Sequence, residues 1–426
     1  MHTVSTRITA VSVVAAGLLA VAIFFGAPRP ASGAEEWLAP VAVPGEIVVR
    51  YDDSTSPRMR TAIAEDLDGR VVRKLRLPRT DLIKVPAESV DDAIEALEQQ
   101  PGVLSAEPNV RVHLMTTPDD AYFPYLWGLE NSGQTAKSGI TKVDADIDAP
   151  EAWNRFTGNG QVKVAVIDTG VDYNHPDLVG SVTGGYDFIA NDPDPMDEHY
   201  HGTHVSGTIG AHGNNGTGVT GVNWNVQILA VRVFDAEGST TLDAIVNGIV
   251  FAGQQGARVA NMSFGGYGHS DAITAAIAGA PNTLFVAAAG NETNNNDKNA
   301  VEPCNVPAPN VLCVAATDAN DRLASFSNFG RRTVDLAAPG VDILSTVPTT
   351  YGEYGMLSGT SMATPHAAGV AALALGLVPD LTTAELKLVL MKSVDRLPKL
   401  KKKCVTGGRL NADKALQKAL SLRQGR

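Results

Sequence analysis

The chain of 426 residues is poor in cysteine and has no excess of basic charge. Its cysteines, Cys304, Cys313 and Cys404, are too few for a fold held by disulfides, so a hydrophobic core must supply the stability. The odd number leaves at least one thiol outside any intramolecular disulfide. The formal net charge of −12 disfavours a nucleic-acid partner, because such a protein normally presents a basic face. We therefore expect no nucleic acid among the partners.

Long apolar runs are absent except near the N-terminus. Arg7 precedes an apolar run over residues 8–27, and small residues follow up to Ala34. This pattern predicts a signal peptide over residues 1–34, cleaved after Ala34, and hence a secreted, extracellular protein. The apolar run is also long enough to span a bilayer, so an uncleaved membrane anchor is the alternative. We expect membrane contact only in that case.

A short Ala-, Pro- and Glu-containing linker over residues 35–44 precedes a small unit that ends near residue 115. Its segments have the order β-α-β-β-α-β, which is typical of a ferredoxin-like α+β unit. Ser89 is the expected N-cap of its second helix, and Pro101 and Gly102 the stop. The expected strands cover residues 47–51, 70–75, 82–85 and 103–112, and the expected helices cover residues 58–67 and 90–97.

The remainder, from about residue 116 to 426, alternates apolar runs with helical stretches and is rich in glycine. Runs that are apolar on both faces and separated by helices predict an α/β fold with a doubly wound parallel sheet. The expected strands cover residues 162–167, 227–233, 258–262, 284–289 and 311–315, with helices over residues 241–254 and 271–279. The charge run over residues 399–403 indicates a solvated helix end or loop.

The first chemical motif is V-A-V-I-D-T-G-V-D over residues 164–172. An apolar strand ends at Asp168, and the carboxyl ends of strands in open α/β sheets are where reactive groups gather. A carboxylate there can accept a hydrogen bond from an imidazole and hold its tautomer. Taken alone, the motif favours an ordinary capping role for Asp168 over a catalytic one.

The second motif is H-G-T-H-V-S-G-T over residues 201–208, at the start of an expected helix. His201 and His204 are three residues apart, and His199 lies nearby, so a zinc site is one alternative. The H-E-x-x-H spacing of helical zinc sites is absent. We favour His201 as a general base and His204 as a buried, hydrogen-bonded core residue.

The third motif is G-T-S-M-A-T-P-H over residues 359–366, which opens a long apolar helix. Ser361 is either a simple N-cap or a nucleophile beside free N–H groups, which favour a developing oxyanion. His366 is interpreted as a packing residue. The order Asp, His, Ser is a known order of catalytic triads. Asn291, after an apolar strand and a glycine, is the candidate second oxyanion donor beside the Ser361 N–H.

These motifs resemble the three signatures of the subtilase family, in its thermitase-like branch. N-M-S-F-G-G at residues 261–266 and A-A-G-N at residues 288–291 resemble two further family motifs. The resemblance implies a subtilisin-like fold and a serine endopeptidase acting on proteins or peptides through Asp168, His201 and Ser361. It also implies a cleft where an extended peptide adds as a strand. The residues implied to line it are Ser263, Phe264, Gly265 and Gly266.

The unit before residue 116 resembles the family's inhibitory propeptide, with A-E-P-N-V at residues 106–110. The resemblance implies a self-processing zymogen whose own propeptide blocks the cleft and assists folding, which is slow for parallel sheets. We expect the cut between about residues 113 and 118; a permanent accessory domain is the alternative. The expected organisation is a signal peptide (1–34), a linker and propeptide (35–115) and a peptidase domain (116–426).

The resemblance further implies structural Ca²⁺, a hard cation that oxygen-only ligands suit. D-D-A-Y-F at residues 119–123, H-P-D-L and the loop G-N-N-G-T-G-V at residues 213–219 resemble one family calcium site. A second acidic loop resembles an additional site, with a solvated acidic turn as the alternative. The implied ligands are Asp120, Asp177, Asn215, Thr217 and Val219 in the first site, and Asp187, Asp192, Asp194 and Asp197 in the second.

The chain also departs from the family pattern. Tyr200, preceded by His199, stands where the family usually has Gly before the catalytic His, which affects specificity more than catalysis. Residues 292–309 differ from the usual outline, so the preferred substrate side chain is not readable. Within this stretch Cys304 has the option of a short disulfide with Cys313, but the Cα separation that decides it is not in the sequence.

The sequence is also compatible with two other functions. An inactive family member that only captures peptides is one, and a latent complex that keeps its propeptide bound is the other.

Overall fold

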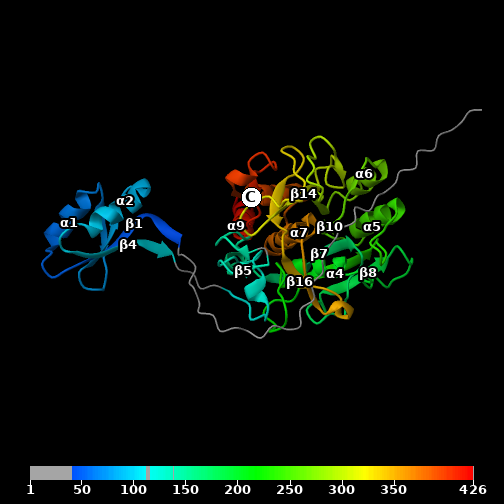
Figure 1. The fold of residues 1–426 in the computed structure, drawn as a ribbon, viewed down its shortest axis with the longest axis horizontal. Coiled ribbons are helices and arrows are strands. Elements are labelled where there is room, and N and C mark those ends of the chain that lie inside the picture. The colour runs from blue at the N-terminus through cyan, green and yellow to red at the C-terminus, as the bar shows by residue number, and fades with distance from the viewer. Residues whose placement is uncertain (1–40, 112–115, 138, 426) are drawn as a thin grey trace, which may run out of the picture. The chain divides into compact units, whose positions relative to one another are not determined.

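The computed structural model describes residues 41–111, 116–137 and 139–425 (Figure 1). The chain divides into two compact units, one within residues 34–114 and one that contains residues 115–426. The predicted signal peptide or anchor, most of the linker and residues 112–115 of the expected cleavage region lie outside the described residues. In the part that is described, no helix is both long and apolar enough to cross a membrane.

The smaller unit is a four-stranded antiparallel sheet in the order β2-β3-β1-β4, with two α-helices. The predicted order β-α-β-β-α-β is confirmed. Ser89 holds the N-cap position of α2 but makes no capping hydrogen bond with its side chain, whereas Ser56 caps α1. The elements are β1 (Val41–Tyr51), α1 (Pro57–Glu65), β2 (Arg70–Lys74), β3 (Thr80–Lys84), η1 (Ala87–Ser89), α2 (Val90–Glu98) and β4 (Val103–Arg111).

The core of the smaller unit follows from alternation along β1. Ile47, Val49 and Tyr51 point to one face and are fully buried, as the two-residue period of a strand requires. Ala93 and Leu97, one helical turn apart on α2, cover this face. The smaller unit therefore has a hydrophobic core of its own.

The larger unit is built on a nine-stranded sheet in the order β18-β19-β15-β14-β12-β10-β7-β9-β8. Each neighbouring pair is parallel except β18 with β19. The expected parallel sheet is confirmed, although the short edge strands were not predicted. The strands are β7 (Gly158–Asp168), β8 (Val182–Asp187), β9 (Asn225–Arg232), β10 (Val259–Met262), β12 (Leu284–Ala288), β14 (Val311–Thr317), β15 (Leu336–Pro339), β18 (Asp395–Arg396) and β19 (Gly408–Arg409).

Helices cover both faces of this sheet, and alternate strand residues face each side. Val164 and Val166 of β7 belong to the core beneath α4 and α7, whereas Ala165 and Ile167 belong to the core beneath α5 and α6. Strands buried on both faces explain the nearly continuous apolar runs in the sequence. The helices are α3 (Ala149–Trp153), α4 (His201–Gly210), α5 (Leu242–Gln254), α6 (Asp271–Ala278), α7 (Thr360–Leu377), α8 (Thr383–Lys392) and α9 (Ala412–Gln424).

Helix α7 runs through the centre of the larger unit (Figure 1), and its residues up to Gly376 are buried. Such all-round burial accounts for its lack of a polar face. Small strand pairs and single turns complete the unit. They are β5 (Thr135–Ala136) with β6 (Gly139–Ile140), β11 (Gly266–Tyr267) with β13 (Val301–Glu302), β16 (Ile343–Thr346) with β17 (Tyr354–Leu357), η2 (Phe123–Tyr125), η3 (Thr349–Tyr351) and η4 (Pro398–Leu400).

Two of the three cysteines form a disulfide in the larger unit. Cys304 and Cys313 form a disulfide with Cα atoms 4.9 Å apart, and Cys404 is free and buried. Burial raises the pKa of the Cys404 thiol.

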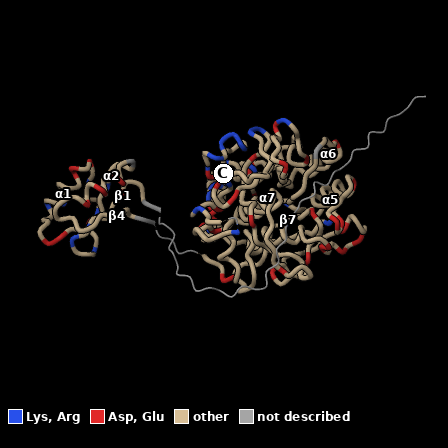
Figure 2. The backbone as a smooth tube through the Cα atoms, in the orientation of Figure 1, with Lys and Arg blue, Asp and Glu red and all other residues tan. Residues whose placement is uncertain are grey.

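The lysine-rich run over residues 399–403 forms the end of η4 and a turn, and Lys403 lies over the ring of Phe329. Blue segments gather near the C-terminal end in Figure 2.

Candidate active site

Asp168 and His201 form a hydrogen-bonded pair at the carboxyl edge of the sheet. Asp168 is the last residue of β7 and His201 the first of α4. The Nδ1 atom of His201 lies 2.8 Å from Oδ1 of Asp168, which also accepts a hydrogen bond from the Thr169 N–H. The carboxylate is buried, whereas 16% of the His201 side chain is exposed. The aspartate can thus orient an imidazole that remains accessible from the solvent.

The electrostatics of this pair favour a proton on His201. Burial lowers the pKa of His201, but the charge of Asp168 and the hydrogen bond to it outweigh this effect, so the pKa is raised. His204 behaves differently: burial lowers its pKa to about 3, and its Nε2 atom bonds to the Ile343 carbonyl at 3.0 Å. His204 is therefore the buried, hydrogen-bonded residue that was expected.

Ser361 lies in the first turn of α7, after the N-cap Gly359. Its hydroxyl donates to the Ser263 carbonyl at 2.8 Å, while the Ser263 hydroxyl donates to the Ser361 carbonyl, also at 2.8 Å. The expected hydrogen bond from Ser361 to His201 is not among those of the described residues. The hydroxyl has turned to a carbonyl acceptor, and catalytic hydrogen bonds often tighten only when substrate is bound.

Asn291 is held beside the N-terminus of α7. Its side-chain oxygen accepts hydrogen bonds from Thr360 N (2.8 Å) and Thr360 Oγ1 (3.0 Å). Because the oxygen is occupied by these donors, the amide NH₂ is the group left to act on a ligand. This orientation suits the expected oxyanion donor.

The expected cleft residues follow β10 and differ in exposure. Ser263 is buried, Phe264 is half-buried against Phe234, and Gly265 and Gly266 are exposed. A methyl group on Gly265 would lie 2.9 Å from the Val301 side chain, so β13 backs this segment closely. The exposed backbone beside Ser361 suits the addition of an extended peptide.

Tyr200 belongs to an aromatic cluster next to His201. Its ring stacks on His199 with centroids 4.0 Å apart and meets Tyr351 edge-on at 5.9 Å. Tyr351 is distant in sequence and was not predicted, since nothing in its local pattern links it to the H-G-T-H motif. Tyr200, at the position before His201 where the resemblance leads us to expect glycine, is thus packed between the rings of His199 and Tyr351.

The first set of expected calcium ligands comes together around Asp177. This carboxylate is fully buried and accepts hydrogen bonds from Asn215 Nδ2 (3.1 Å), Val219 N (2.9 Å) and the Tyr354 hydroxyl (2.9 Å). The Asn215 side chain thus presents its NH₂ to Asp177, with its oxygen accepting from Thr217 N at 2.8 Å. A ligand role for Asn215 requires its amide to turn.

Asp120 contributes a second buried carboxylate to this region. Its Oδ2 atom accepts from Asn214 N at 2.6 Å, while its buried Oδ1 atom has no partner among the described residues. Burial raises its pKa to about 6, and the charge of Asp177 adds to the effect. Nor do the described hydrogen bonds use the carbonyls of Thr217 and Val219. Unsatisfied oxygen atoms beside unpaired acids fit a hard cation.

The second acidic loop corrects the prediction for Asp197. Its Oδ1 atom accepts from Thr169 Oγ1 and His199 N, and its Oδ2 atom accepts from Thr203 N and Thr203 Oγ1. A carboxylate has about four lone-pair sites, so protein donors satisfy Asp197 completely. It is not a metal ligand in this arrangement. Thr169 and Thr203 were missed as site residues, although both stand within the D-T-G and H-G-T-H motifs.

The other three acids lie close together along the loop, because the backbones of Asp187 and Asp192 exchange two hydrogen bonds and Asp192 Oδ1 accepts from Asp194 N at 2.9 Å. Asp187 is buried and forms an ion pair with Arg232 at 3.1 Å. Asp192 and Asp194 are exposed, and Asp194 accepts a hydrogen bond from the Tyr173 hydroxyl at 2.8 Å. Within the described ranges, no three His, Cys, Asp or Glu side chains gather in a metal-binding group, and this holds for the histidines near His201 and for both acidic regions.

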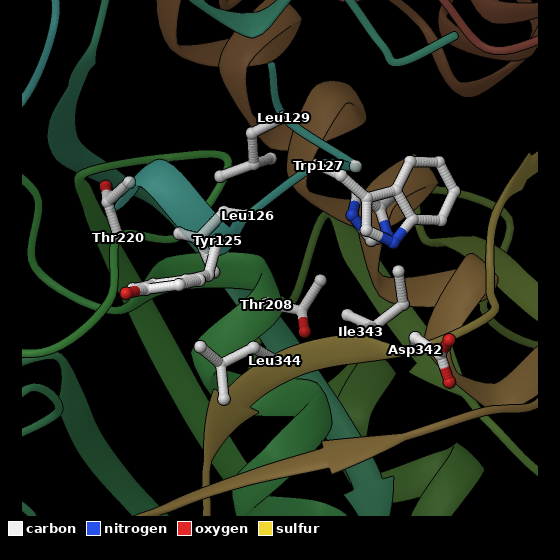
Figure 3. Close-up of a pocket in the computed structure, with 11 residues that line it drawn as sticks. Tyr125, Leu126, Trp127, Leu129, Thr208, Thr220, Asp342, Ile343 and Leu344 are labelled. Carbon is white, nitrogen blue, oxygen red and sulfur yellow. The ribbon is translucent and has the colours of Figure 1, made fainter. Parts of the chain in front are cut away.

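A small pocket lies apart from the catalytic residues, between the segment after η2, α4 and β16 (Figure 3). Trp127, Leu129, Thr208, Ile343 and Leu344 are among the side chains around it. The lining is mainly apolar and includes none of the triad residues, so the pocket has no place in the proposed chemistry.

Known proteins resemble both units of the chain. Residues 159–425 match the model of the subtilase family, and residues 40–109 match that of the fervidolysin N-terminal prodomain. The chain is 41% identical over 339 residues to a thermophilic serine proteinase of Bacillus sp. (strain AK1), with 78% of each chain covered. It is 45% identical over 261 residues to thermitase of Thermoactinomyces vulgaris, which covers 60% of this chain and 85% of thermitase.

Solved structures show the same similarity. A cold-adapted subtilisin-like serine proteinase matches with a TM-score of 0.55 and 37% identity, over 67% of this chain and 97% of that structure. A protease of Pseudoalteromonas arctica PAMC 21717 matches with a TM-score of 0.62 and 32% identity, over 71% and 100%.

Proposed function

Because the chain belongs to the subtilase family and is a subtilisin-like serine protease with an N-terminal prodomain, we propose that it is a secreted endopeptidase made as a self-processing zymogen. The catalytic groups are Asp168, His201 and Ser361, with Asn291 as an oxyanion donor. The observation that carries this assignment is the 2.8 Å contact of Asp168 with His201 at the sheet edge where α7 presents Ser361. The substrates are proteins or peptides.

The reaction follows from the positions of these groups. Ser361 turns from the Ser263 carbonyl towards His201 and attacks the peptide carbonyl, while His201 accepts its proton. His201 then protonates the leaving amine, and water hydrolyses the acyl-enzyme by the same proton path. Asp168 holds the imidazole through Nδ1 and stabilises the imidazolium. The developing oxyanion accepts hydrogen bonds from the Ser361 N–H and the Asn291 amide.

The exposed backbone of Gly265 and Gly266 holds the substrate as an added strand, with Ser263 and Phe264 fixing this segment from beneath. The prodomain, which folds on a core of its own, acts as the inhibitor until it is cut away. Its match to a family prodomain supports this role over that of a permanent accessory domain.

Ca²⁺ is the proposed structural ion of the region around Asp177. Asp120, Asp177 and Asn215 would hold it with their side chains, and Thr217 and Val219 with their carbonyls. The ion would neutralise two buried acids and so stabilise the loop over residues 213–219. The second-site roles of Asp187, Asp192 and Asp194 stay predictions.

The experiment that tests the function compares wild type with Ser361→Ala by mass spectrometry after purification with calcium. We expect wild type to lose the residues before about 116, whereas the variant keeps them and shows no peptidase activity. Loss of the Ser361 hydroxyl should lower kcat by about 10⁶-fold. Normal turnover by the variant would contradict the assignment, and an inert wild type that no serine-reactive phosphonate labels would favour the peptide-binding alternative.

A further inference from the structure

Asp197 is a buried carboxylate that lies behind the catalytic pair and does not belong to the triad. Only 4% of the residue is exposed. Its four hydrogen bonds measure 2.8 Å to Thr169 Oγ1, 2.9 Å to His199 N, 2.9 Å to Thr203 N and 2.6 Å to Thr203 Oγ1. All four donors are fixed parts of two segments, so the carboxylate joins those segments at one point.

The two segments are those that carry the catalytic pair. Thr169 directly follows Asp168 at the end of β7, and its hydroxyl oxygen also accepts from Gly202 N at 2.9 Å. Thr203 lies in the first turn of α4, two residues after His201, and its hydroxyl oxygen also accepts from Asp172 N at 2.9 Å. Each threonine therefore links the strand end to the helix start, and Asp197 bonds to both.

On the basis of these contacts, and resting on the proposed function, we propose that Asp197 is a positioning residue for peptide hydrolysis. It sets the distance and angle between Asp168 and His201 through Thr169 and Thr203. Because its oxygens are saturated, it acts as a fixed acceptor and takes no part in proton transfer itself.

The charge of Asp197 also acts on the general base. The groups that face His201 are Asp168 from β7, Asp197 and His199 from the segment before α4, and His204 from α4. The two histidines lose their positive charge readily, since burial lowers the pKa of each. Burial raises the pKa of Asp197 itself to about 6. Above that pH, Asp168 and Asp197 are the charges that stabilise the imidazolium formed when Ser361 gives up its proton.

The test replaces Asp197 with Asn in the full-length chain and uses active-site titration to count competent sites. The NH₂ group of asparagine replaces one carboxylate oxygen and faces the two donors of that oxygen. Each oxygen accepts from one backbone N–H, so one backbone N–H loses its acceptor whichever oxygen is replaced. We expect kcat to fall by about 10²-fold, the cost of a misplacement near 1 Å, with KM close to wild type. The acid limb of kcat/KM should move to lower pH, because His201 loses a charge that raises its pKa.

Asp335→Asn is the matched control. Asp335 is a buried acid of the same unit that accepts from Cys313 N at 2.9 Å and pairs with Lys387 at 3.2 Å, away from the catalytic pair. It should keep the wild-type kcat and pH profile per titrated site. If Asp197→Asn matches this control in both measurements, the positioning role is wrong.

Thr203→Val and Thr203→Ser keep the proposal testable if Asp197→Asn does not fold. Valine removes the hydroxyl that donates to Asp197, whereas serine retains it, so we expect serine to restore kcat and valine to lower it. Equal kcat values for the two variants would overturn the inference. Failure of the proposed function is distinct, because an inactive wild type or an active Ser361→Ala protein would reveal it before these variants are compared.

Discussion

The larger unit has two acidic regions, and their buried carboxylates differ in the hydrogen-bond and ion-pair partners that they find. Around Asp177, two buried carboxylates lie together without a Lys or Arg ion pair among the described residues, and Asp120 keeps an oxygen with no partner. In the loop that contains Asp187 and Asp197, Arg232 pairs with Asp187, and four donors satisfy both oxygens of Asp197, although burial still raises the pKa of Asp197 to about 6.

This difference shows what separates a cation site from an acidic loop. A buried charge is costly unless it is paired or coordinates a metal. In the second loop the protein itself provides the compensation, and Asp197 uses it to support the catalytic pair. In the first region one oxygen of Asp120 has no partner among the described residues, so the proposed cation would stabilise the fold most there.

The largest expected effect is therefore that of calcium removal. We expect chelation to lower the melting temperature of the Ser361→Ala protein, which cannot digest itself, by about 6 °C. The estimate takes about 4 kcal/mol for an ion present at 1,000 times its Kd. It divides this by an unfolding entropy of about 2.1 cal/mol/K per residue over the roughly 310 residues of the larger unit, which gives about 1.5 °C per kcal/mol. Calorimetry with calcium or with chelator measures the shift, and equal melting temperatures would contradict the proposed ion.

Asp177→Asn should abolish most of this calcium-dependent shift, because it removes the central charge of the first region. The variant also weakens hydrogen bonds from Val219 N and the Tyr354 hydroxyl, so it loses some stability without calcium. The quantity to compare is therefore the difference between the melting temperature with calcium and that with chelator. Asp192→Asn, in the same background, is the control and should keep the full difference. A reversed result would move the principal ion to the second loop.

The same contrast explains how much the sequence could predict. The parallel sheet and the positions of Asp168, His201 and Ser361 followed from apolar runs and three motifs, since both patterns are local. The short strands β18 and β19 have no such pattern and form only by pairing beside β15. Local acidity likewise could not reveal that Arg232, far along the chain, compensates Asp187.

Contacts between residues far apart in the sequence decide whether an acidic side chain binds a metal ion or a group of the protein. Asp197 lies in an acidic loop that resembles a family calcium loop, and this resemblance implied a ligand role, but its donors Thr169 and Thr203 come from the two catalytic motifs. The rotamer of Ser361 was equally unpredictable, because the acceptor that it finds belongs to residue 263.

A smaller effect is expected for Asp187→Asn, which breaks a buried ion pair. Loss of the Asp187 charge leaves Arg232 with Glu198 as its remaining ion-pair partner among the described residues, so part of the buried positive charge is uncompensated. We expect a cost of about 1.5–3 kcal/mol, that of a hydrogen bond to a charged group. We expect this loss with calcium and with chelator alike, as measured by denaturant unfolding of the Ser361→Ala protein. The double variant Asp187→Asn/Arg232→Met should recover part of it, because it removes the uncompensated charge. A loss confined to the calcium-bound protein would instead identify Asp187 as a ligand.

The smallest effect is expected for Asp194→Asn. Asp194 is exposed, and its hydrogen bond to the Tyr173 hydroxyl raises the pKa of that tyrosine. Surface substitutions of this kind change stability by about 0.5 kcal/mol or less, so the melting temperature should hardly move. Calcium titration by calorimetry decides its role, with Tyr173→Phe as the control for the lost hydrogen bond. If Asp194→Asn lowers the number of bound ions while Tyr173→Phe does not, the second loop binds calcium through its exposed acids. If the number of bound calcium ions is unchanged, the region around Asp177 remains the proposed site. Unsatisfied oxygen atoms, rather than the number of acidic residues, would then determine where calcium binds.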